Sequence, residues 1–172
     1  MPNWCENKLE IVGDINETLR RFLKKGLKFS RIVEPVVISE DPTGAGMVSA
    51  QLEHWGTKWD LEDDEAERRG RDCLEQGYCF FETAWSPPSA AIEELSRQIP
   101  GVKFALYYHE PGCSFYGTEY FENGVMTGDS QDAYGQEYAD FLMNIFDYDE
   151  YDAMINAGLD TDDDEEEEEE ST

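Results

Sequence analysis

Residues 78–108, with the sequence YCFFETAWSPPSAAIEELSRQIPGVKFALYY, contain the strand–helix–strand pattern that decides the fold. Residues 78–85 are rich in aromatic side chains and predict a strand. Ser86-Pro87-Pro88 predicts the start of a helix, with Ser86 as its cap, because proline is tolerated in the first helical turn. One face of this helix is apolar, formed by Ala91, Ile92, Leu95 and Ile99. Beyond Pro100-Gly101, apolar residues alternate as in a half-buried strand: Val102, Phe104, Leu106 and Tyr108.

The chain on either side of this stretch predicts further elements. Residues 9–12 predict a strand, and Asn16 caps a short helix that ends at Gly26. We expect the following region to form a loop, a strand and a charged turn, in that order: residues 35–48, 48–55 and 62–71. After residue 108, the dipeptide Asn123-Gly124 predicts the turn of a terminal hairpin. The order β-α-β-β-α-β predicts an α+β fold, a ferredoxin-like split β-α-β sandwich with an antiparallel sheet.

The C-terminal part predicts a helical extension and a disordered acidic tail. A stripe of apolar residues at helical spacing is expected to pack over the sheet or to extend the core: Tyr138, Phe141, Leu142, Ile145 and Phe146. A second short helix, ending at Gly158, continues the stripe with Tyr148, Tyr151, Met154 and Ile155. From Asp160 onward, the acids repel one another and bury nothing. We therefore expect a ferredoxin-like domain over residues 1–130, the amphipathic extension over 131–159 and the tail over 160–172.

Charge is distributed unevenly along the chain. All 13 Lys and Arg residues lie within residues 1–103, together with 19 acids, whereas residues 104–172 contain 21 acids and no Lys or Arg. A surface of this sign repels phosphate backbones and attracts basic surfaces. We therefore expect no free nucleic acid as a partner, and we expect a basic protein, such as one that itself binds nucleic acid.

Composition favours a cytoplasmic protein without metal or cofactor. No stretch approaches the roughly 18 apolar residues of a membrane span, and the N-terminus lacks the basic and apolar run of a signal peptide. The scattered cysteines are expected to be reduced thiols: Cys5, Cys73, Cys79 and Cys113. The Cys and His residues lack zinc-site spacing, and residues 147–152 lack the fifth-position oxygen ligand and the glycine of a calcium loop.

One alternative is an RNA- or DNA-binding module. Gly77-Tyr78-Cys79-Phe80-Phe81 is similar to the motif whose exposed aromatics stack bases in RNA-recognition domains. Gln76 stands in place of the leading basic residue, and Glu10 stands where a stacking aromatic is needed on the first strand. We therefore favour core aromatics beneath the third helix. In the alternative, the acidic tail folds back as an autoinhibitor onto the basic residues 20–31, which otherwise form a solvated helix face.

A second alternative is an enzyme that uses Cys113 and His109. The segment from Tyr108 to Cys113 lies at a predicted strand end, where a Cys–His pair could form. Neither an orienting residue nor an oxyanion site accompanies the pair, and catalysis needs the whole constellation. We therefore expect no catalytic activity.

Four segments of the chain contain tryptophan or closely spaced turn residues: residues 1–7, 55–60, 83–88 and 108–117. Taken alone, the tryptophans are expected to be core aromatics, or else a shared patch in which Lys58 and Asp60 pair or contact a partner. Together, the segments resemble the YubB ferredoxin-like family of plasmid, phage and other mobile-element proteins. The resemblance spans about residues 1–130 and implies the same fold but no established activity. The motif residues are Trp4, Trp55, Gly56, Lys58, Trp59, Asp60, Trp85, Pro87, Pro88, Glu110 and Gly112.

These observations predict a non-enzymatic interaction protein of a mobile element, which mimics nucleic acid and binds a basic host or defence protein. A bacterial host cytoplasm is the expected location. The predicted partner-binding surface consists of the C-terminal acids: Asp147, Asp149, Glu150, Asp152, Asp160, Asp162, Asp163, Asp164, Glu165, Glu166, Glu167, Glu168, Glu169 and Glu170.

Overall fold

The computed structural model describes residues 3–36 and 44–159 and contains two compact units, residues 1–133 and 134–172. Each unit is described by itself. The predicted acidic tail, residues 160–172, lies outside the described residues. The predicted domain boundary after residue 130 falls inside the last strand of the first unit.

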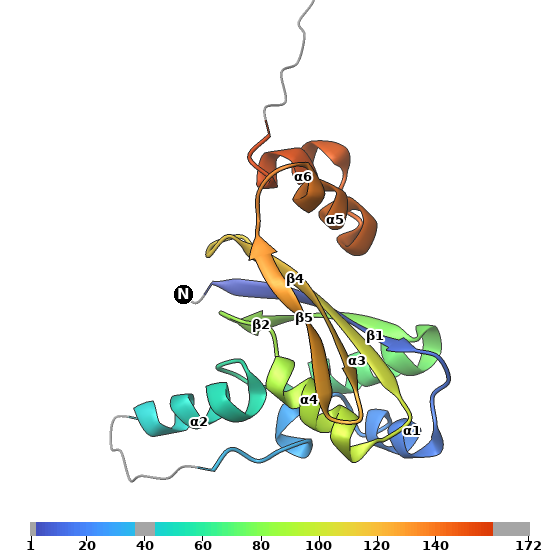
Figure 1. The fold of residues 1–172 in the computed structure, drawn as a ribbon. Coiled ribbons are helices and arrows are strands. Elements are labelled where there is room, and N and C mark those ends of the chain that lie inside the picture. The colour runs from blue at the N-terminus through green and yellow to red at the C-terminus, as the bar shows by residue number, and fades with distance from the viewer. Residues whose placement is uncertain (1–2, 37–43, 160–172) are drawn as a thin grey trace, which may run out of the picture. The chain divides into compact units, whose positions relative to one another are not determined.

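The first unit is built on one five-stranded sheet with the strand order β2-β1-β3-β4-β5, in which every neighbouring pair is antiparallel (Figure 1). β2, helix α4 (Ser89–Gln98) and β3 form a split β-α-β unit, because β1 lies between β2 and β3. An α+β fold with an antiparallel sheet was predicted from the sequence. The strand bounds are β1 (Trp4–Val12), β2 (Tyr78–Ala84), β3 (Lys103–Glu110), β4 (Phe115–Glu122) and β5 (Val125–Asp132).

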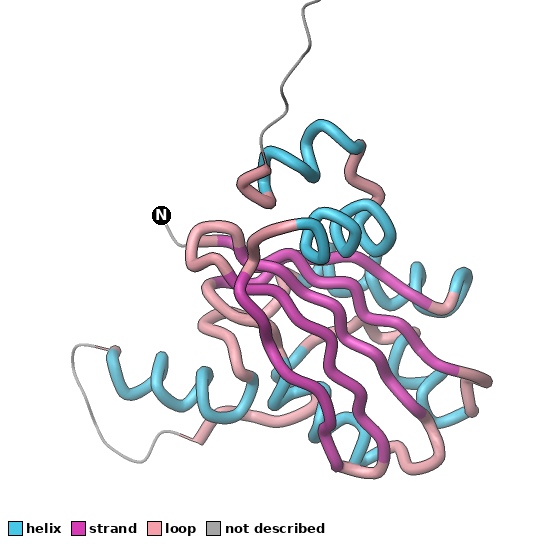
Figure 2. Tube along the Cα trace, turned by 45° about the horizontal axis from the view of Figure 1, so that its top comes forward, coloured by secondary structure: helices cyan, strands magenta, loops and turns pink. Residues whose placement is uncertain are grey.

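Helices of this unit cover one face of the sheet. α4 contacts β3, β4 and β5, and α3 contacts β2. α1 packs on α3, and α2 packs on α4. Figure 2 shows the other face of the sheet, the one opposite to α3 and α4, turned toward the viewer. The remaining bounds are α1 (Glu17–Leu23), the 3-10 helix η1 (Phe29–Arg31), α2 (Ala45–Trp55) and α3 (Asp63–Gln76).

The hydrophobic core lies between the sheet and these helices, where the alternation of apolar residues places it. Strand residues alternate between the two faces of a sheet, and the predicted alternating set of β3 is buried. Asn16 caps α1 as predicted, because its side-chain oxygen accepts a hydrogen bond from the Leu19 amide at 2.9 Å. The predicted hairpin turn is also confirmed, with positive φ angles of 53° at Asn123 and 75° at Gly124.

Two predicted elements before β2 are wrong. Residues 48–55, predicted to form a strand, belong to α2, which contains good helix formers and ends at Gly56 in the left-handed conformation. Residues 62–71 were predicted to form a charged turn, but residues 63–71 belong to α3 and Glu62 is its N-cap. The first turn of α3 carries three acids, which favour a helix N-terminus. α3 has no conspicuous hydrophobic stripe, because its fully buried residues are all small: Ala66, Gly70 and Cys73.

The predicted start of α4 is also wrong. The helix begins at Ser89, and Pro88 occupies the capping position without a side-chain hydrogen bond. The Ser86 hydroxyl donates instead to the carbonyl oxygen of Gly56 at 2.5 Å. Ser86 therefore connects the segment after β2 to the end of α2 rather than capping α4.

The second unit contains two helices that contact each other, α5 (Gln136–Phe146) and α6 (Glu150–Asn156). α5 forms where the apolar stripe predicts it, and Tyr138 and Leu142 are fully buried. The stripe predicted for α6 is wrong, because Tyr151 and Ile155 are exposed, and the buried residues of this segment are Ala153 and Ala157. That α5 covers part of the sheet stays a prediction. No helix among the described residues combines the length and the apolarity needed to cross a membrane.

The close approach of α1 and α3 provides a test of the packing. A methyl group at Gly70 would collide with the carbonyl oxygen of Leu23 and lie 3.0 Å from the Gly26 Cα atom. We expect Gly70→Ala to lower the free energy of unfolding by about 1–3 kcal/mol, as overpacked cores do. At an exposed helical position the same change stabilises by up to about 1 kcal/mol. Urea denaturation measures the difference, with Arg68→Ala on the exposed side of α3 as the control, and a stabilised Gly70→Ala protein would contradict this packing.

Candidate functional site

The predicted motif residues meet at the end of the sheet where β1 begins and β2 ends. Trp4 pairs with Ala84 across these two strands. The amide of Trp85 then donates to the carbonyl oxygen of Asn3 at 2.9 Å, so both indoles start from adjacent backbone. Trp85 has a φ of 72°, a conformation that costs energy for a bulky residue and therefore needs support from its surroundings.

Hydrogen bonds from buried polar side chains provide that support. The Asn7 amide donates to the Thr83 hydroxyl at 2.8 Å, and this hydroxyl donates to the carbonyl oxygen of Ser86 at 2.8 Å. The Thr57 hydroxyl donates to the carbonyl oxygen of Ala84 at 2.9 Å. These bonds hold the segment after β2 against the segment after α2. All three side chains belong to the motif segments, but sequence reasoning assigned them no role in these hydrogen bonds.

Glycines allow the same segments to approach closely. A Cβ atom at Gly56 would lie 2.9 Å from the carbonyl oxygen of Pro87, and one at Gly112 would lie 2.6 Å from the Asn3 side-chain nitrogen. Glu110 is almost fully buried, and its carboxylate accepts hydrogen bonds from the amides of Gly112 at 2.8 Å and Cys113 at 2.5 Å. Glu110 and Gly112 therefore shape the turn after β3.

Two other motif residues have structural roles. Trp55 is buried, as expected for a core aromatic, and its indole N–H donates to the carbonyl oxygen of Val33 at 2.8 Å. The Asp60 carboxylate accepts hydrogen bonds from the amides of Phe29 at 2.7 Å and Ser30 at 3.0 Å, at the start of η1. Its oxygens are thus engaged by backbone rather than by Lys58.

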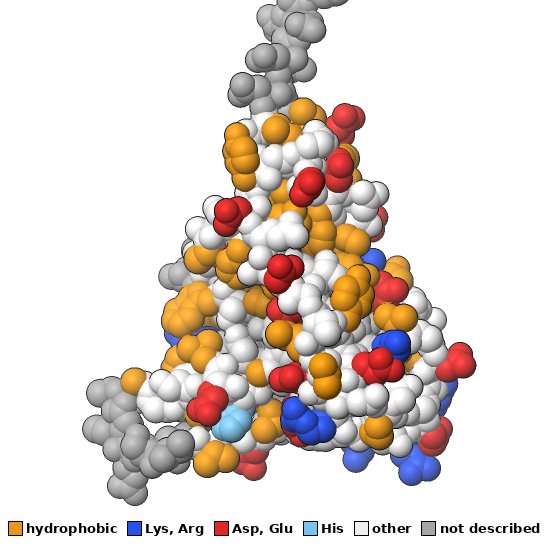
Figure 3. Space-filling model, viewed as in Figure 1, with side chains coloured by type: hydrophobic (Ala, Val, Ile, Leu, Met, Phe, Trp, Pro, Cys, Tyr) orange, Lys and Arg blue, Asp and Glu red, His pale blue; other side chains and the backbone are white. Residues whose placement is uncertain are grey.

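The other three tryptophans form an exposed cluster with Lys58, which we call the tryptophan patch: Trp4, Lys58, Trp59 and Trp85. The exposed fractions of Trp4, Trp59 and Trp85 are 44, 42 and 41%, which contradicts the expectation that all four tryptophans are core aromatics. The Lys58 ammonium lies 4.3 Å from the ring centroid of Trp85 and 4.9 Å from that of Trp59, within cation–π range. The Trp4 and Trp59 centroids are 6.0 Å apart. Hydrophobic side chains gather over this side of the molecule in Figure 3.

A second aromatic cluster lies on the face of the sheet opposite to α3 and α4. The Lys8 ammonium lies 4.9 Å from the ring centroid of Tyr78, 5.6 Å from that of Phe80 and 5.9 Å from that of Tyr107. The register places two acids, Glu6 and Glu10, on the same face beside Lys8. The protein's own ammonium thus engages the rings that the RNA-recognition alternative assigns to base stacking.

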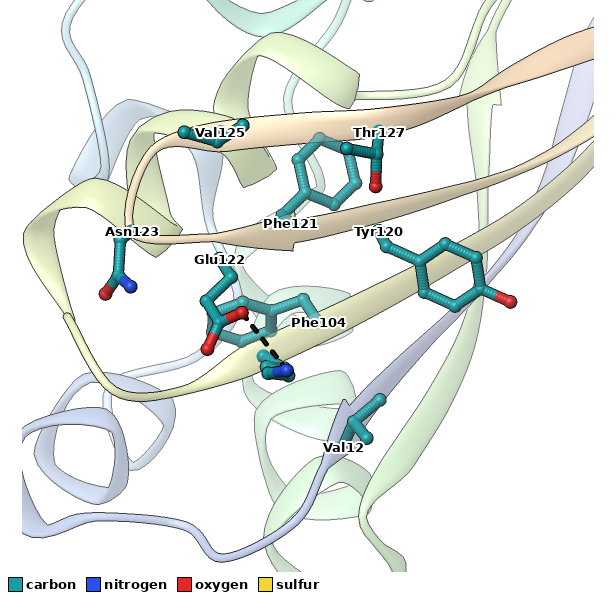
Figure 4. Close-up of a pocket in the computed structure, with 9 residues that line it drawn as sticks. Val12, Phe104, Tyr120, Phe121, Glu122, Asn123, Val125 and Thr127 are labelled. Atoms are coloured by element: carbon teal, nitrogen blue, oxygen red, sulfur yellow. Dashed lines mark ion pairs between the residues drawn. The ribbon is translucent and has the colours of Figure 1, made fainter.

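The same face has a cavity of about 500 Å³ at the end of the sheet away from the tryptophan patch. Its walls include Val12, Tyr120 and Val125. Lys103 and Glu122 form an ion pair among the lining side chains, with a nitrogen–oxygen distance of 3.1 Å (Figure 4). Because this pair is neutral as a whole, the cavity has no marked preference for a charged partner.

The described part of the predicted acidic surface lies on the second unit. Asp147 follows α5 with a φ of 57°, and Asp149 caps α6 by accepting a hydrogen bond from the Asp152 amide at 2.8 Å. Glu150 and Asp152 occupy the first turn of α6, and all four residues are exposed. Figure 3 shows acidic side chains and no Lys or Arg over α5 and α6. The other predicted surface residues, 160–170, lie outside the described residues.

Cys113 and His109 lie in different environments. The buried His109 faces Glu6 across β1 and β3, with 3.4 Å between its Nε2 atom and the carboxylate. Cys113 is exposed and contacts Asn3, with 3.4 Å between the amide nitrogen and Sγ. A hydrogen bond to Glu110 raises the pKa of the Cys113 thiol, whereas a nucleophilic cysteine needs a lowered pKa. Within the part of the chain that the structure describes, no group of three or more His, Cys, Asp or Glu residues could hold a metal ion.

A family model described as "Ferredoxin-like domain in Api92-like protein" matches residues 54–172. The chain belongs to this family. The match confirms the ferredoxin-like fold predicted from the sequence. It begins within α2 and so covers four of the five strands, whereas β1, which lies between β2 and β3, precedes it. No curated protein and no solved structure matches the chain.

The contact between Lys58 and two indoles predicts a contribution to stability. We expect Lys58→Met, which keeps the apolar stem and removes the charge, to lower the free energy of unfolding by about 0.5–1 kcal/mol. Chemical denaturation followed by circular dichroism measures it. Lys24→Met, at the exposed position after the last residue of α1, is the control, and equal stability of the two variants would show that the Lys58 ammonium contributes nothing.

The raised pKa of Cys113 predicts slow alkylation at neutral pH. Because the thiolate is the reactive form, we expect the pH midpoint of its reaction with iodoacetamide to lie above that of N-acetylcysteine. Mass spectrometry of the folded protein follows the reaction at this one exposed cysteine. A midpoint below that of the free thiol would contradict the structural role and favour the Cys113/His109 enzyme.

Proposed function

We propose that this chain is a non-enzymatic interaction protein that binds a basic, nucleic-acid-binding protein through its acidic C-terminal part. The observation that carries the proposal is the lack of internal neutralisation. Within the described residues 134–159, none of the six acids forms an ion pair with Lys or Arg. Because these acids keep their charge exposed, they favour a cationic partner over a phosphate backbone.

The proposal includes an origin and a location. The tryptophan and turn motifs resemble the YubB family of mobile-element proteins, which supports an origin on a plasmid or phage and action in the cytoplasm of a bacterial host. In that setting, a concentrated anionic surface would mimic nucleic acid and occupy the binding surface of a host or defence protein. Association of this kind is steered by electrostatics and weakens as salt screens the charges.

A nucleic-acid-binding module is the competing function, supported by the aromatic rings around Lys8. Base stacking needs a cationic groove beside the rings. A group of exposed basic side chains lies instead in the helix layer, where Arg21, Lys25 and Arg31 line a cavity of about 530 Å³ with Phe22. The separation of this basic group from the rings around Lys8 favours the interaction protein.

The proposed function predicts salt-sensitive capture of basic proteins. The intact chain, immobilised and exposed to bacterial lysate, should retain basic nucleic-acid-binding proteins that mass spectrometry identifies. Deletion of residues 160–172, which removes 10 of the 16 acids of residues 134–172, should weaken capture about tenfold at 0.15 M salt. A second variant neutralises four described acids and keeps the α6 cap, because asparagine also caps helices: Asp147→Asn, Asp149→Asn, Glu150→Gln and Asp152→Asn.

Two outcomes would contradict the proposal. If neither the deletion nor higher salt changes capture, the acidic part does not bind the partner. If the chain without residues 160–172 binds single-stranded RNA or DNA in fluorescence anisotropy, whereas the intact chain does not, the autoinhibited nucleic-acid module is favoured.

A further inference from the structure

A small cavity lies beside the tryptophan patch, between the end of β2 and the segment that leads into α3. Its volume is about 140 Å³, and the indoles of Trp4 and Trp59 form part of its wall. Sites for drug-sized ligands usually measure about 300–1,000 Å³, so this cavity suits a single side chain better than a small molecule. Because the two indoles are exposed, the cavity is reachable from solvent.

The polar part of the wall is acidic. Glu62, Glu65 and Glu82 line the cavity, and no Lys or Arg of the described residues does so. Glu65 lies 3.4 Å from Arg69, whereas Glu62 and Glu82 are exposed and form no ion pair with a described Lys or Arg. Aromatic faces and carboxylates together attract a cationic group.

A cationic group of the protein itself already contacts one of the two indoles of the cavity wall, that of Trp59. Lys58 places its ammonium between Trp59 and Trp85, at 4.9 and 4.3 Å from their ring centroids. Trp59 therefore contacts the protein's own cation and also lines the cavity. The cavity adds the indole of Trp4 and three glutamates. The contact with Lys58 shows that the indole of Trp59 accepts a cation within cation–π range.

We propose that the cavity beside Trp4 and Trp59 binds an arginine side chain of a basic partner protein. A guanidinium fits better than an ammonium, because its planar face stacks on indole while its N–H groups form paired hydrogen bonds to a carboxylate. The assignment of a basic partner rests on the proposed function. The cavity adds a specific anchor on the first unit, separate from the acidic C-terminal part.

The test measures binding of a fluorescein-labelled hexa-arginine peptide by anisotropy at 0.15 M salt. We expect the double variant Glu62→Gln/Glu82→Gln to weaken binding about three- to tenfold. The charge-matched control is Glu67→Gln/Glu75→Gln, which removes two exposed acids from α3 outside the cavity. Trp4→Leu should weaken hexa-arginine binding more than hexa-lysine binding, since leucine removes the stacking surface. Circular dichroism confirms that each variant folds.

Failure of this inference can be told apart from failure of the proposed function. Equal binding by the cavity variant and its control would overturn the arginine site, whereas the proposed function would stand if deletion of residues 160–172 still weakened binding. If that deletion left binding unchanged and the cavity variant lost it, the arginine site would stand without the acidic C-terminal part. No binding of hexa-arginine by the intact chain would overturn both.

Discussion

The candidate site depends on the buried hydrogen bonds that connect the end of β2 to the segment after α2. Thr57 and Ser86 each donate to a carbonyl oxygen of the other segment, and Thr83 holds the bend between Ala84 and Ser86. A buried donor or acceptor that loses its partner costs about 1–3 kcal/mol, so this arrangement tolerates little displacement. Because the segments are fixed to each other, residues far apart in the chain present their indoles on one surface.

The distribution of charge along the chain determines which kind of partner the molecule favours. Basic residues end at Lys103, so the second unit has no Lys or Arg of its own with which to neutralise its acids. The first unit is less acidic overall, yet its carboxylates at Glu62 and Glu82 lie beside exposed indoles rather than beside bases. Two separate parts of the molecule therefore favour positively charged groups, one through a concentration of acids and the other through a shaped aromatic cavity.

The sequence predicts those elements in which buried residues recur at the regular spacing of a strand or a helix. Strands β2 and β3 and the hairpin turn follow from alternation and from Asn123-Gly124, because a half-buried strand and a tight turn leave distinct local patterns. α3 was missed because its fully buried residues are all small, among them Gly70, which allows close backbone approach but leaves no conspicuous hydrophobic stripe in the sequence. The motifs predicted core tryptophans, with a shared aromatic patch as the alternative, and three of the four tryptophans form such a patch. They could not predict that three are exposed, because exposure depends on how segments far apart in sequence cover one another.

Both aromatic clusters of the first unit contain a lysine of the chain itself. Lys8 lies among Tyr78, Phe80 and Tyr107, and Lys58 lies between Trp59 and Trp85. In a protein that stacks nucleic-acid bases, ring faces must remain open and cations must line the path of the phosphates. Here the cations cover the ring faces and the neighbouring side chains include carboxylates, which is the reverse arrangement. The aromatic residues of this fold are therefore better suited to binding positive groups than to reading nucleic acid.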